Sequence, residues 1–383
     1  MKPTALLLLF LPSAVSSPCF ADAPPRYKMT VLPLSVGGHD QLDNFDFSGG
    51  IKGTYILGTQ TVHKGRLSDE RAALWQQGHP VRLLDTTPVT PQASSSSLYT
   101  SLTPTALNRR GECVGYSYYT FSGAWSSKSA TACLWRAGQS TKLLGYLPTA
   151  GRADLLGFPP DTDSVALAIN DSSEIVGSVS YNNHDKTPND NPPARIAGTH
   201  AFLRRKGKIR LLWPGIALGI SNRGWIVGIK DTGDDLSSSG VRGILWRNGQ
   251  TTLFKMQPVA ISGSGEIAGN IPLTEDDGRA CVWQQGRITR LSKQTSHAYA
   301  LNNKQQVVGE LDGEAKPFPT HAVLWQNDRT FDLNRCVPLP KGWVLSKAIG
   351  INDSGWIIGE GSVSKTLKSK PAVQIFTFLL TPR

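Results

Sequence analysis

Charged residues, long apolar runs and helical periodicity are all scarce in this chain of 383 residues. Asp, Glu, Lys and Arg make up 18% of it, against about 25% in an average globular protein, and hydrophobic residues make up 39%. The hydrophobic share is enough for a core and excludes a disordered chain. No segment after residue 23 has the roughly eighteen consecutive apolar residues that a membrane-spanning helix needs. Acidic residues are fewer than basic ones, with 29 Asp and Glu against 40 Lys and Arg. The resulting net charge of +11 favours anionic partners.

The motifs of common enzymes and cofactor sites are also missing. The sequence has no C-x-x-C pair, no H-E-x-x-H, no G-x-S-x-G and no P-loop, so nothing supports a zinc ribbon, a thioredoxin-like centre or a nucleotide site. Acidic clusters occur, but none follows the EF-hand calcium pattern. We therefore expect no catalytic residue, no metal, no cofactor and no nucleic-acid partner.

The first 23 residues resemble a secretory signal peptide. Lys2 precedes a seven-residue apolar stretch at residues 5–11, and Ala-Asp-Ala at residues 21–23 offers a cleavage site. The chain is therefore expected to be periplasmic or secreted, and such a location permits disulfides. Cys113 and Cys133 fall on neighbouring predicted strands, which makes them a candidate disulfide, although cysteine is also a common small core residue.

One two-part pattern returns along the rest of the chain. Its first half is a stretch such as Ala-x-x-Ile-Asn, then a short polar turn, then a β-branched pair followed by glycine. Clear copies lie at residues 106–115, 166–177, 218–228, 260–269, 300–309 and 348–359, with a weaker copy at residues 51–58. The second half is a small residue, two apolar residues and a fixed tryptophan, as at Trp75, Trp135, Trp246, Trp283 and Trp325.

Each half of the pattern has the sequence of a β-hairpin. Turns such as Asn-Asp-Ser-Gly place a polar residue first and glycine where φ is positive, and Asn248-Gly249 is a strong two-residue hairpin signal. Runs of Ile, Val, Leu and Trp suit half-buried strands. Each unit therefore predicts four short antiparallel strands, a to d. A repeat of about 40 to 50 residues with four strands is typical of a propeller blade.

The predicted fold is all-β: a single domain at residues 24–383 forming a seven-bladed β-propeller of four-stranded antiparallel blades. The last unit lacks a d strand, whereas a spare strand at residues 26–34 precedes the first unit. Insertion of this N-terminal strand into the last blade would close the ring and remove exposed sheet edges. A six-bladed propeller and a β-solenoid are the alternatives.

The repeat unit resembles the HAF repeats of bacterial extracellular repeat proteins. His200-Ala201-Phe202-Leu203 matches the letters that give these repeats their name, and residues 378–382 are similar to the usual ending of the family. The resemblance covers nearly all of the chain after residue 23, and unit one departs from it most. It implies an exported, repeat-built protein, but it implies no reaction and no catalytic residue.

The connections between strands differ in length on the two predicted faces. The b–c and d–a connections are long and varied and share one face, here called the broad face, whereas the tight a–b and c–d turns share the narrow face. Loops on a rigid frame commonly carry function, so we expect a binding surface on the broad face and at the channel mouth. The candidate ligand-binding residues are aromatic, histidine and acidic side chains of these connections, namely Tyr118, Tyr119, Trp125, Tyr181, His184, Asp231, Asp234 and Asp235.

These features predict an exported, monomeric, non-enzymatic propeller that binds its partner through the broad face. The expected partner is a protein, an anionic glycan or an envelope surface. One alternative is a polysaccharide hydrolase or lyase that uses carboxylates at the channel mouth, and another is a structural envelope or surface component. The densest basic run, at residues 204–210, lies on a c–d hairpin, where a solvated hairpin is the simplest explanation.

Overall fold

The computed structural model describes most of the repeat region and leaves the signal-peptide prediction outside the described residues. The described residues are 24–32, 45–46, 50–64, 67–76, 82–83, 98–121, 128–136, 142–144, 162–181, 198–231, 242–272, 278–312, 320–367 and 370–383. Apart from one short 3-10 helix, Leu333–Arg335, every regular element among them is a β-strand. No helix in this part of the chain is long and apolar enough to cross a membrane.

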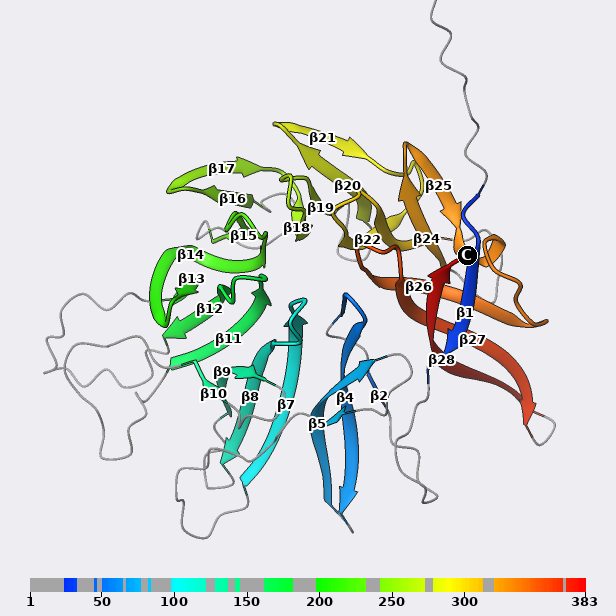
Figure 1. The fold of residues 1–383 in the computed structure, drawn as a ribbon, viewed down its shortest axis with the longest axis horizontal. Coiled ribbons are helices and arrows are strands. Elements are labelled where there is room, and N and C mark those ends of the chain that lie inside the picture. The colour runs from blue at the N-terminus through cyan, green and yellow to red at the C-terminus, as the bar shows by residue number, and fades with distance from the viewer. Residues whose placement is uncertain are drawn as a thin grey trace, which may run out of the picture.

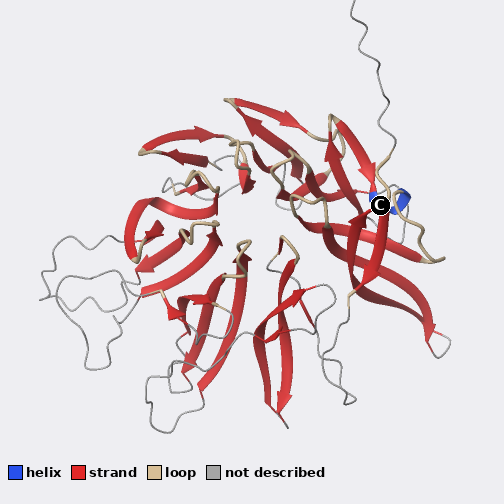
Figure 2. Cartoon of the chain, in the orientation of Figure 1, coloured by secondary structure: helices blue, strands red, loops and turns tan. Residues whose placement is uncertain are grey.

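The strands form six antiparallel sheets arranged around a common centre, which makes the fold a β-propeller (Figures 1 and 2). The first sheet contains β2 (Phe45–Asp46), β3 (Ile51–Lys52), β4 (Tyr55–Lys64), β5 (Leu67–Gln76) and β6 (Arg82–Leu83). The second contains β7 (Leu98–Leu107), β8 (Cys113–Phe121), β9 (Lys128–Trp135) and β10 (Lys142–Leu143). The third contains β11 (Thr162–Ile169), β12 (Ile175–Tyr181), β13 (Gly198–Arg205), β14 (Lys208–Ile220), β15 (Ile226–Lys230), β16 (Gly243–Arg247) and β17 (Gln250–Phe254).

The remaining three sheets continue the same order of strands. The fourth contains β18 (Gln257–Ile261), β19 (Ile267–Pro272), β20 (Gly278–Gln284) and β21 (Arg287–Arg290). The fifth contains β22 (Ser296–Leu301), β23 (Val307–Asp312), β24 (Thr320–Gln326) and β25 (Arg329–Asp332). The sixth contains β26 (Trp343–Ile351), β27 (Ile357–Leu367), β28 (Lys370–Pro382) and the N-terminal strand β1 (Tyr27–Val31).

The prediction of seven separate four-stranded blades is wrong. Five sheets stand alone as blades, whereas the third is one sheet of seven strands. The reason is β14, which pairs with β13 as far as Pro214 and with β15 from Gly215 onward. Strand d of one repeat therefore continues directly into strand a of the next, so these two repeats share a strand instead of forming separate sheets.

The predicted insertion of the N-terminal strand into the last sheet is confirmed. β1 pairs antiparallel with β28, in register over residues 27–31 and 378–382. Leu32 follows β1 and packs with Leu379 of the last sheet against Ile51 of the first sheet. The N-terminal segment thus completes the last sheet and also contributes to its apolar contact with the first.

In six of the repeats, the glycine that ends the a–b pattern is required by a bulge in strand a. In β11 the register shifts by one residue between Ala166 and Ala168, opposite Gly177 in β12. A Cβ atom on Gly177 would lie 1.9 Å from the carbonyl oxygen of Val165, well inside van der Waals contact. A Cβ would lie at most 2.2 Å from a strand-a carbonyl oxygen at the equivalent glycines Gly115, Gly228, Gly269, Gly309 and Gly359.

The candidate disulfide between Cys113 and Cys133 is wrong, because all four described cysteines are free and buried. The pairing of β8 with β9 places Cys113 opposite Trp135 and Cys133 opposite Gly115, so the two thiols are diagonal neighbours rather than a facing pair. The Cys133 thiol donates instead to the carbonyl oxygen of Thr131 at 3.2 Å. Burial, as the largest effect, raises the pKa of both thiols to about 12.

Replacement of a repeat glycine should destabilise the fold far more than replacement of a turn glycine. We expect Gly177→Ala to lower the free energy of unfolding by about 3 kcal/mol or more, because backbone must move to admit the Cβ. Gly249→Ala is the matched control: Gly249 has a φ of +89° and no atom within 4 Å of the added Cβ, so only backbone strain of about 1 kcal/mol is expected. Urea unfolding measures both, and equal losses would contradict the steric role of the bulge.

The buried cysteines should resist alkylation in the native protein. With a pKa of about 12, Cys113, Cys133 and Cys281 are expected to be thiolate in only about one molecule in ten thousand at pH 8. Peptide mapping after brief iodoacetamide treatment should find them unmodified, and the same treatment in urea should modify all three. Rapid native labelling, or a peptide linked through Cys113 and Cys133, would contradict this assignment.

Candidate functional site

On the narrow face, four of the a–b turns are each joined to the next turn by the asparagine side chain that begins them. Asn170 Oδ1 accepts hydrogen bonds from the backbone N–H groups of Ser172 and Glu174, at 3.0 and 2.9 Å. Asn170 Nδ2 then donates to the carbonyl oxygen of Ser221 in the next turn, at 3.1 Å. The same link to a neighbouring turn runs from Asn108 to Asn170, from Asn302 to Asn352 and from Asn352 to Gly53.

The residues that follow these asparagines form a second set of links near the centre. Asp353 accepts hydrogen bonds from the N–H and Nδ2 of Asn303, both at 2.9 Å, and pairs with Arg109 of the second sheet. Arg109 Nε also lies 3.8 Å from Asp171. Burial alone would raise the pKa of Asp353, but the hydrogen bonds from Asn303 and Arg109 outweigh it and lower that pKa. These opposite charges satisfy one another, so this centre is best explained as structural.

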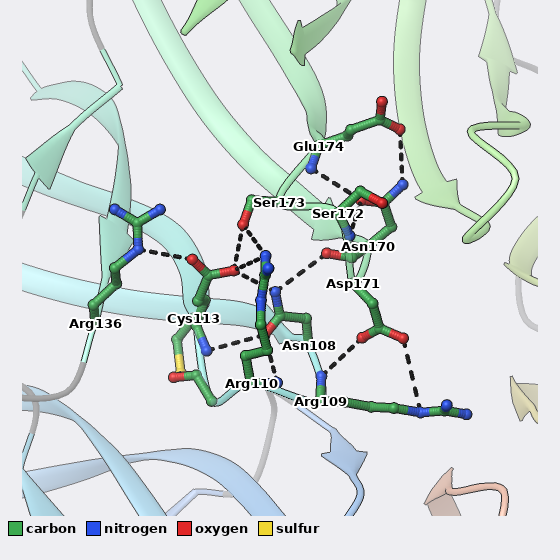
Figure 3. A network of polar contacts seen from close by, with 12 residues as sticks. Asn108, Arg109, Arg110, Cys113, Arg136, Asn170, Asp171, Ser172, Ser173 and Glu174 are labelled. Carbon is green, nitrogen blue, oxygen red and sulfur yellow. Dashed lines mark hydrogen bonds and ion pairs between the residues drawn. The ribbon is translucent and has the colours of Figure 1, made fainter. Parts of the chain in front are cut away.

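Glu112 joins the second and third sheets on the same face. Figure 3 shows Arg110, Arg136 and Ser173 pointing toward one carboxylate, which is that of Glu112. Both arginine contacts measure 2.7 Å, and Asn108 Nδ2 donates to the same carboxylate at 2.6 Å. Burial would raise the pKa of Glu112, but these hydrogen bonds outweigh it and lower the pKa to about 2.

The candidate residues from the broad-face loops are only partly described. Trp125, His184, Asp234 and Asp235 lie outside the described residues. The backbones of Tyr118 and Tyr119 belong to β8, opposite Ala130 and Ser129 of β9, so these residues extend a strand pair instead of forming a loop.

The other two candidates lie at strand ends of the third sheet. Tyr181 is the last residue of β12. Asp231 follows β15 and is exposed, and its N–H donates to the carbonyl oxygen of Pro214 at 2.8 Å. The role of all eight residues in ligand binding stays a prediction.

A polar group that the sequence analysis missed lies on the inner strands of the fifth and sixth sheets, away from the a–b turns. We call it the inner-strand cluster; it consists of His297, Tyr299, Glu310, Lys347 and Glu360. Glu310 lies opposite His297, and Glu360 lies opposite Lys347. Glu310 Oε1 accepts a hydrogen bond from the Tyr299 hydroxyl at 2.7 Å and lies 3.4 Å from His297 Nδ1. Lys347 Nζ lies 3.0 Å from Glu360 Oε2.

Tyr299 owes its exposure to the bulge in strand a. It is the extra residue between Ala298 and Ala300, and 38% of its surface is exposed. Bulges re-aim side chains and are common beside functional sites. The equivalent residues of the other bulges are smaller or aliphatic and half-buried, namely Thr105, Leu167, Leu218, Val259 and Ile349.

The surroundings of Tyr299 keep its hydroxyl protonated. Burial contributes most to raising the pKa of this phenol above its ordinary value. The hydrogen bond to Glu310 and the negative charges of Glu310 and Glu360 raise it further. Tyr299 therefore presents an aromatic ring with a neutral hydroxyl.

A sequence signal for the inner-strand cluster did exist: only the repeats ending at Gly309 and Gly359 have an acidic residue directly after the glycine.

A basic hollow of about 500 Å³ lies beside the cluster in the fourth sheet. Its lining residues are Arg279, Arg290, Leu291, Ser292 and Lys293. They belong to the start of β20, the end of β21 and the d–a connection that follows, which places the hollow on the broad face. A Cβ on Gly278, the residue before Arg279, would lie 2.9 Å from His297 Nε2. The hollow and the cluster are therefore neighbours.

Comparison with known proteins finds likeness of fold only. No family model matches the chain, and neither does any curated protein sequence. The β-propeller domain of the Trilobed protease from Pyrococcus furiosus is 9% identical, with 87% of this chain and 93% of that chain covered and a TM-score of 0.49. The acylaminoacyl peptidase of Pyrococcus horikoshii is 9% identical, with 86% and 52% covered and a TM-score of 0.46.

A sialidase is a more distant structural neighbour. The Trypanosoma rangeli enzyme is 8% identical, with 88% of this chain and 54% of that chain covered and a TM-score of 0.35. The chain thus spans about half the length of this sialidase and of the Pyrococcus horikoshii peptidase. None of these likenesses assigns a role to a residue of the site, and the resemblance to HAF repeats stays a prediction.

Removal of the Glu112 charge should change the acid stability of the fold. The pKa of Glu112 is about 2 in the folded protein and 4.5 ordinarily, so its contribution is complete above pH 4.5 and is lost as the pH falls toward 2. We expect Glu112→Gln to lower the free energy of unfolding by about 2 kcal/mol at pH 7 and by almost nothing near pH 2. Asp328→Asn, at an exposed hairpin turn, is the control with the same charge change. Urea unfolding from pH 2 to 7 measures both; a Glu112→Gln effect independent of pH would refute this role.

Proposed function

We propose that this protein is an exported, non-enzymatic propeller that binds a glycan on its broad face through the inner-strand cluster. The observation that carries the proposal is the partly exposed side chain of Tyr299. Its hydroxyl donates a hydrogen bond to Glu310, and Glu360 is close enough to act on it electrostatically. An aromatic ring with a polar tip suits the apolar face of a sugar, and neighbouring carboxylates can accept hydrogen bonds from its hydroxyl groups. Export rests on the resemblance of residues 1–23 to a signal peptide.

The repeat pattern supports seven sequence repeats within this propeller, two of which share the seven-stranded sheet. The seven-stranded sheet contains two a–b turns with the repeat sequence, those beginning at Asn170 and Ser221. We therefore count β14 both as strand d of one unit and as strand a of the next. In this description the inner-strand cluster occupies the last two units, next to the closure by β1.

The contacts of the cluster favour recognition over turnover. A glycoside hydrolase of the usual kind needs one carboxyl group that gives a proton and a second that attacks the sugar or activates water. Here Glu310 is engaged by Tyr299 and His297, and Glu360 is engaged by Lys347. Such mutual contacts hold the side chains in place to present fixed donors and acceptors to a ligand.

A glycan array followed by calorimetry on the best oligosaccharide tests the proposal. We expect Tyr299→Ala to weaken binding about 10-fold or more, because the stacking surface and the hydroxyl are both lost. Tyr299→Phe keeps the ring and should retain most of the affinity, whereas Glu310→Gln should weaken binding by an intermediate factor. Leu218→Ala, at the equivalent bulge of another sheet, is the control and should bind as the unaltered protein does.

Four results would count against the proposal. Absence of binding to any glycan, or unchanged affinity of a Tyr299→Ala protein that melts normally, would overturn it. Turnover of the oligosaccharide would favour the hydrolase or lyase alternative. The variant with Tyr118, Tyr119 and Trp125 replaced by alanine tests these aromatic candidates separately; a loss of binding there, with Tyr299→Ala unaffected, would move the binding site to these residues.

A further inference from the structure

Among the residues that the structure describes, the lining of the basic hollow in the fourth sheet has three cations and no acidic side chain. Arg279, Arg290 and Lys293 line it, and its other lining residues, Leu291 and Ser292, are uncharged. Like charges in one concavity repel one another, and low-dielectric walls strengthen the field that they produce there. An anion in the hollow would relieve this repulsion.

The strand register explains why the two arginines converge. Arg290 of β21 lies directly opposite Cys281 of β20, and Arg279 lies two residues before Cys281. Residues two apart in a strand, and residues directly opposite across a ladder, share one side of a sheet. The N–H of Leu291 donates to the carbonyl oxygen of Ala280 at 2.8 Å, which continues this pairing past the end of β21. Both guanidinium groups therefore start from the same side of a well-paired hairpin.

Arg279 also has a buried donor that the described residues leave without a partner. Its Nη1 atom is inaccessible to solvent and makes no hydrogen bond within the described part of the chain. A buried donor without a partner is unfavourable, and arginine forms its strongest hydrogen bonds with oxyanions such as carboxylates and sulfates. This orphaned nitrogen leaves Arg279, a lining residue of the hollow, with an unsatisfied donor.

We propose that the hollow holds an anionic substituent, a carboxylate or a sulfate, of the glycan bound by the inner-strand cluster. This inference rests on the proposed function and adds the class of the ligand, an acidic oligosaccharide. The link between the two parts is His297, whose Nδ1 lies 3.4 Å from Glu310 and whose Nε2 faces the position of Gly278, beside Arg279. One sugar chain can thus stack on Tyr299 and place a charged neighbouring residue against Arg279 and Arg290.

The test compares acidic and neutral oligosaccharides of matched length on the full chain. The probes are a uronate oligosaccharide, a sulfated oligosaccharide and a neutral oligosaccharide, measured by calorimetry at low and high salt. We expect the acidic probes to bind at least 10-fold more tightly than the neutral one at low salt, with the difference shrinking as salt screens the charges. Arg279→Gln and Arg290→Gln should each remove about 10-fold for the acidic probes and leave the neutral probe unchanged.

Arg287→Gln is the matched control, because Arg287 belongs to the same strand but lies at the opposite, narrow-face end, paired with Gln284. It should leave every affinity unchanged. Arg290 is exposed, so Arg290→Gln keeps the test valid if Arg279→Gln impairs folding. The carboxylated and sulfated probes, measured separately, show which anion the hollow prefers.

The two proposals fail in different ways. If no oligosaccharide binds, the proposed function is wrong. If oligosaccharides bind in a Tyr299-dependent manner, but acidic and neutral probes bind equally, or Arg279→Gln and Arg290→Gln behave like Arg287→Gln, only the role of the hollow is wrong. Acid selectivity that persists in both hollow variants would likewise overturn it.

Discussion

The pairing of β1 with β28 is the contact on which the placement of the first and last sheets depends. Strands β26 to β28 come from the end of the chain, and β1 comes from its beginning, so this ladder joins parts of the sequence that are about 350 residues apart. Leu32 and Leu379 then bury apolar surface against Ile51 of the first sheet. The narrow face repeats the link with polar groups, where Asn352 donates to Gly53 and Arg109 pairs with Asp353. The inner strands therefore hold fixed positions around one centre.

The repeated structure leaves only a few positions free to vary, and the candidate site uses them. The repeat glycine is required by the bulged strand opposite it, and the asparagine that begins four of the turns is required by the links between turns. The bulged residue and the residue after the glycine differ from sheet to sheet, although Thr105 and Asn270 at these positions also bond to the next sheet. In the fifth and sixth sheets these positions include Tyr299, Glu310 and Glu360, whereas the residues at these positions in the other sheets are all uncharged. The proposed recognition site thus uses positions whose residues vary between repeats.

The charged side chains near the narrow-face turns differ in their pairing from those that line the hollow. On the narrow face the charged groups near the turns are paired internally: Glu112 with Arg110 and Arg136, and Glu174 with Arg205. The pairs of Glu112 with Arg136 and of Glu174 with Arg205 join the end of strand c to the a–b turn. On the broad face, the hollow is lined within the described part of the chain by cations and no acidic residue. Some of the positive charge of the chain is therefore concentrated at the hollow, where the strand register brings cationic side chains together.

Local sequence patterns determined the hairpins, the all-β fold and the insertion of the N-terminal strand, because turn residues and alternating apolar residues act over a few positions and the missing strand d is visible by counting. The continuous strand β14, the diagonal placement of Cys113 and Cys133, and the inner-strand cluster were decided by tertiary structure. Tyr299 and Glu360 belong to different repeats. The acidic residues after the repeat glycines become one cluster only because the fifth and sixth sheets lie side by side. Strand register and the packing between sheets set the distances between these residues, and the local periodicity of a single repeat encodes neither.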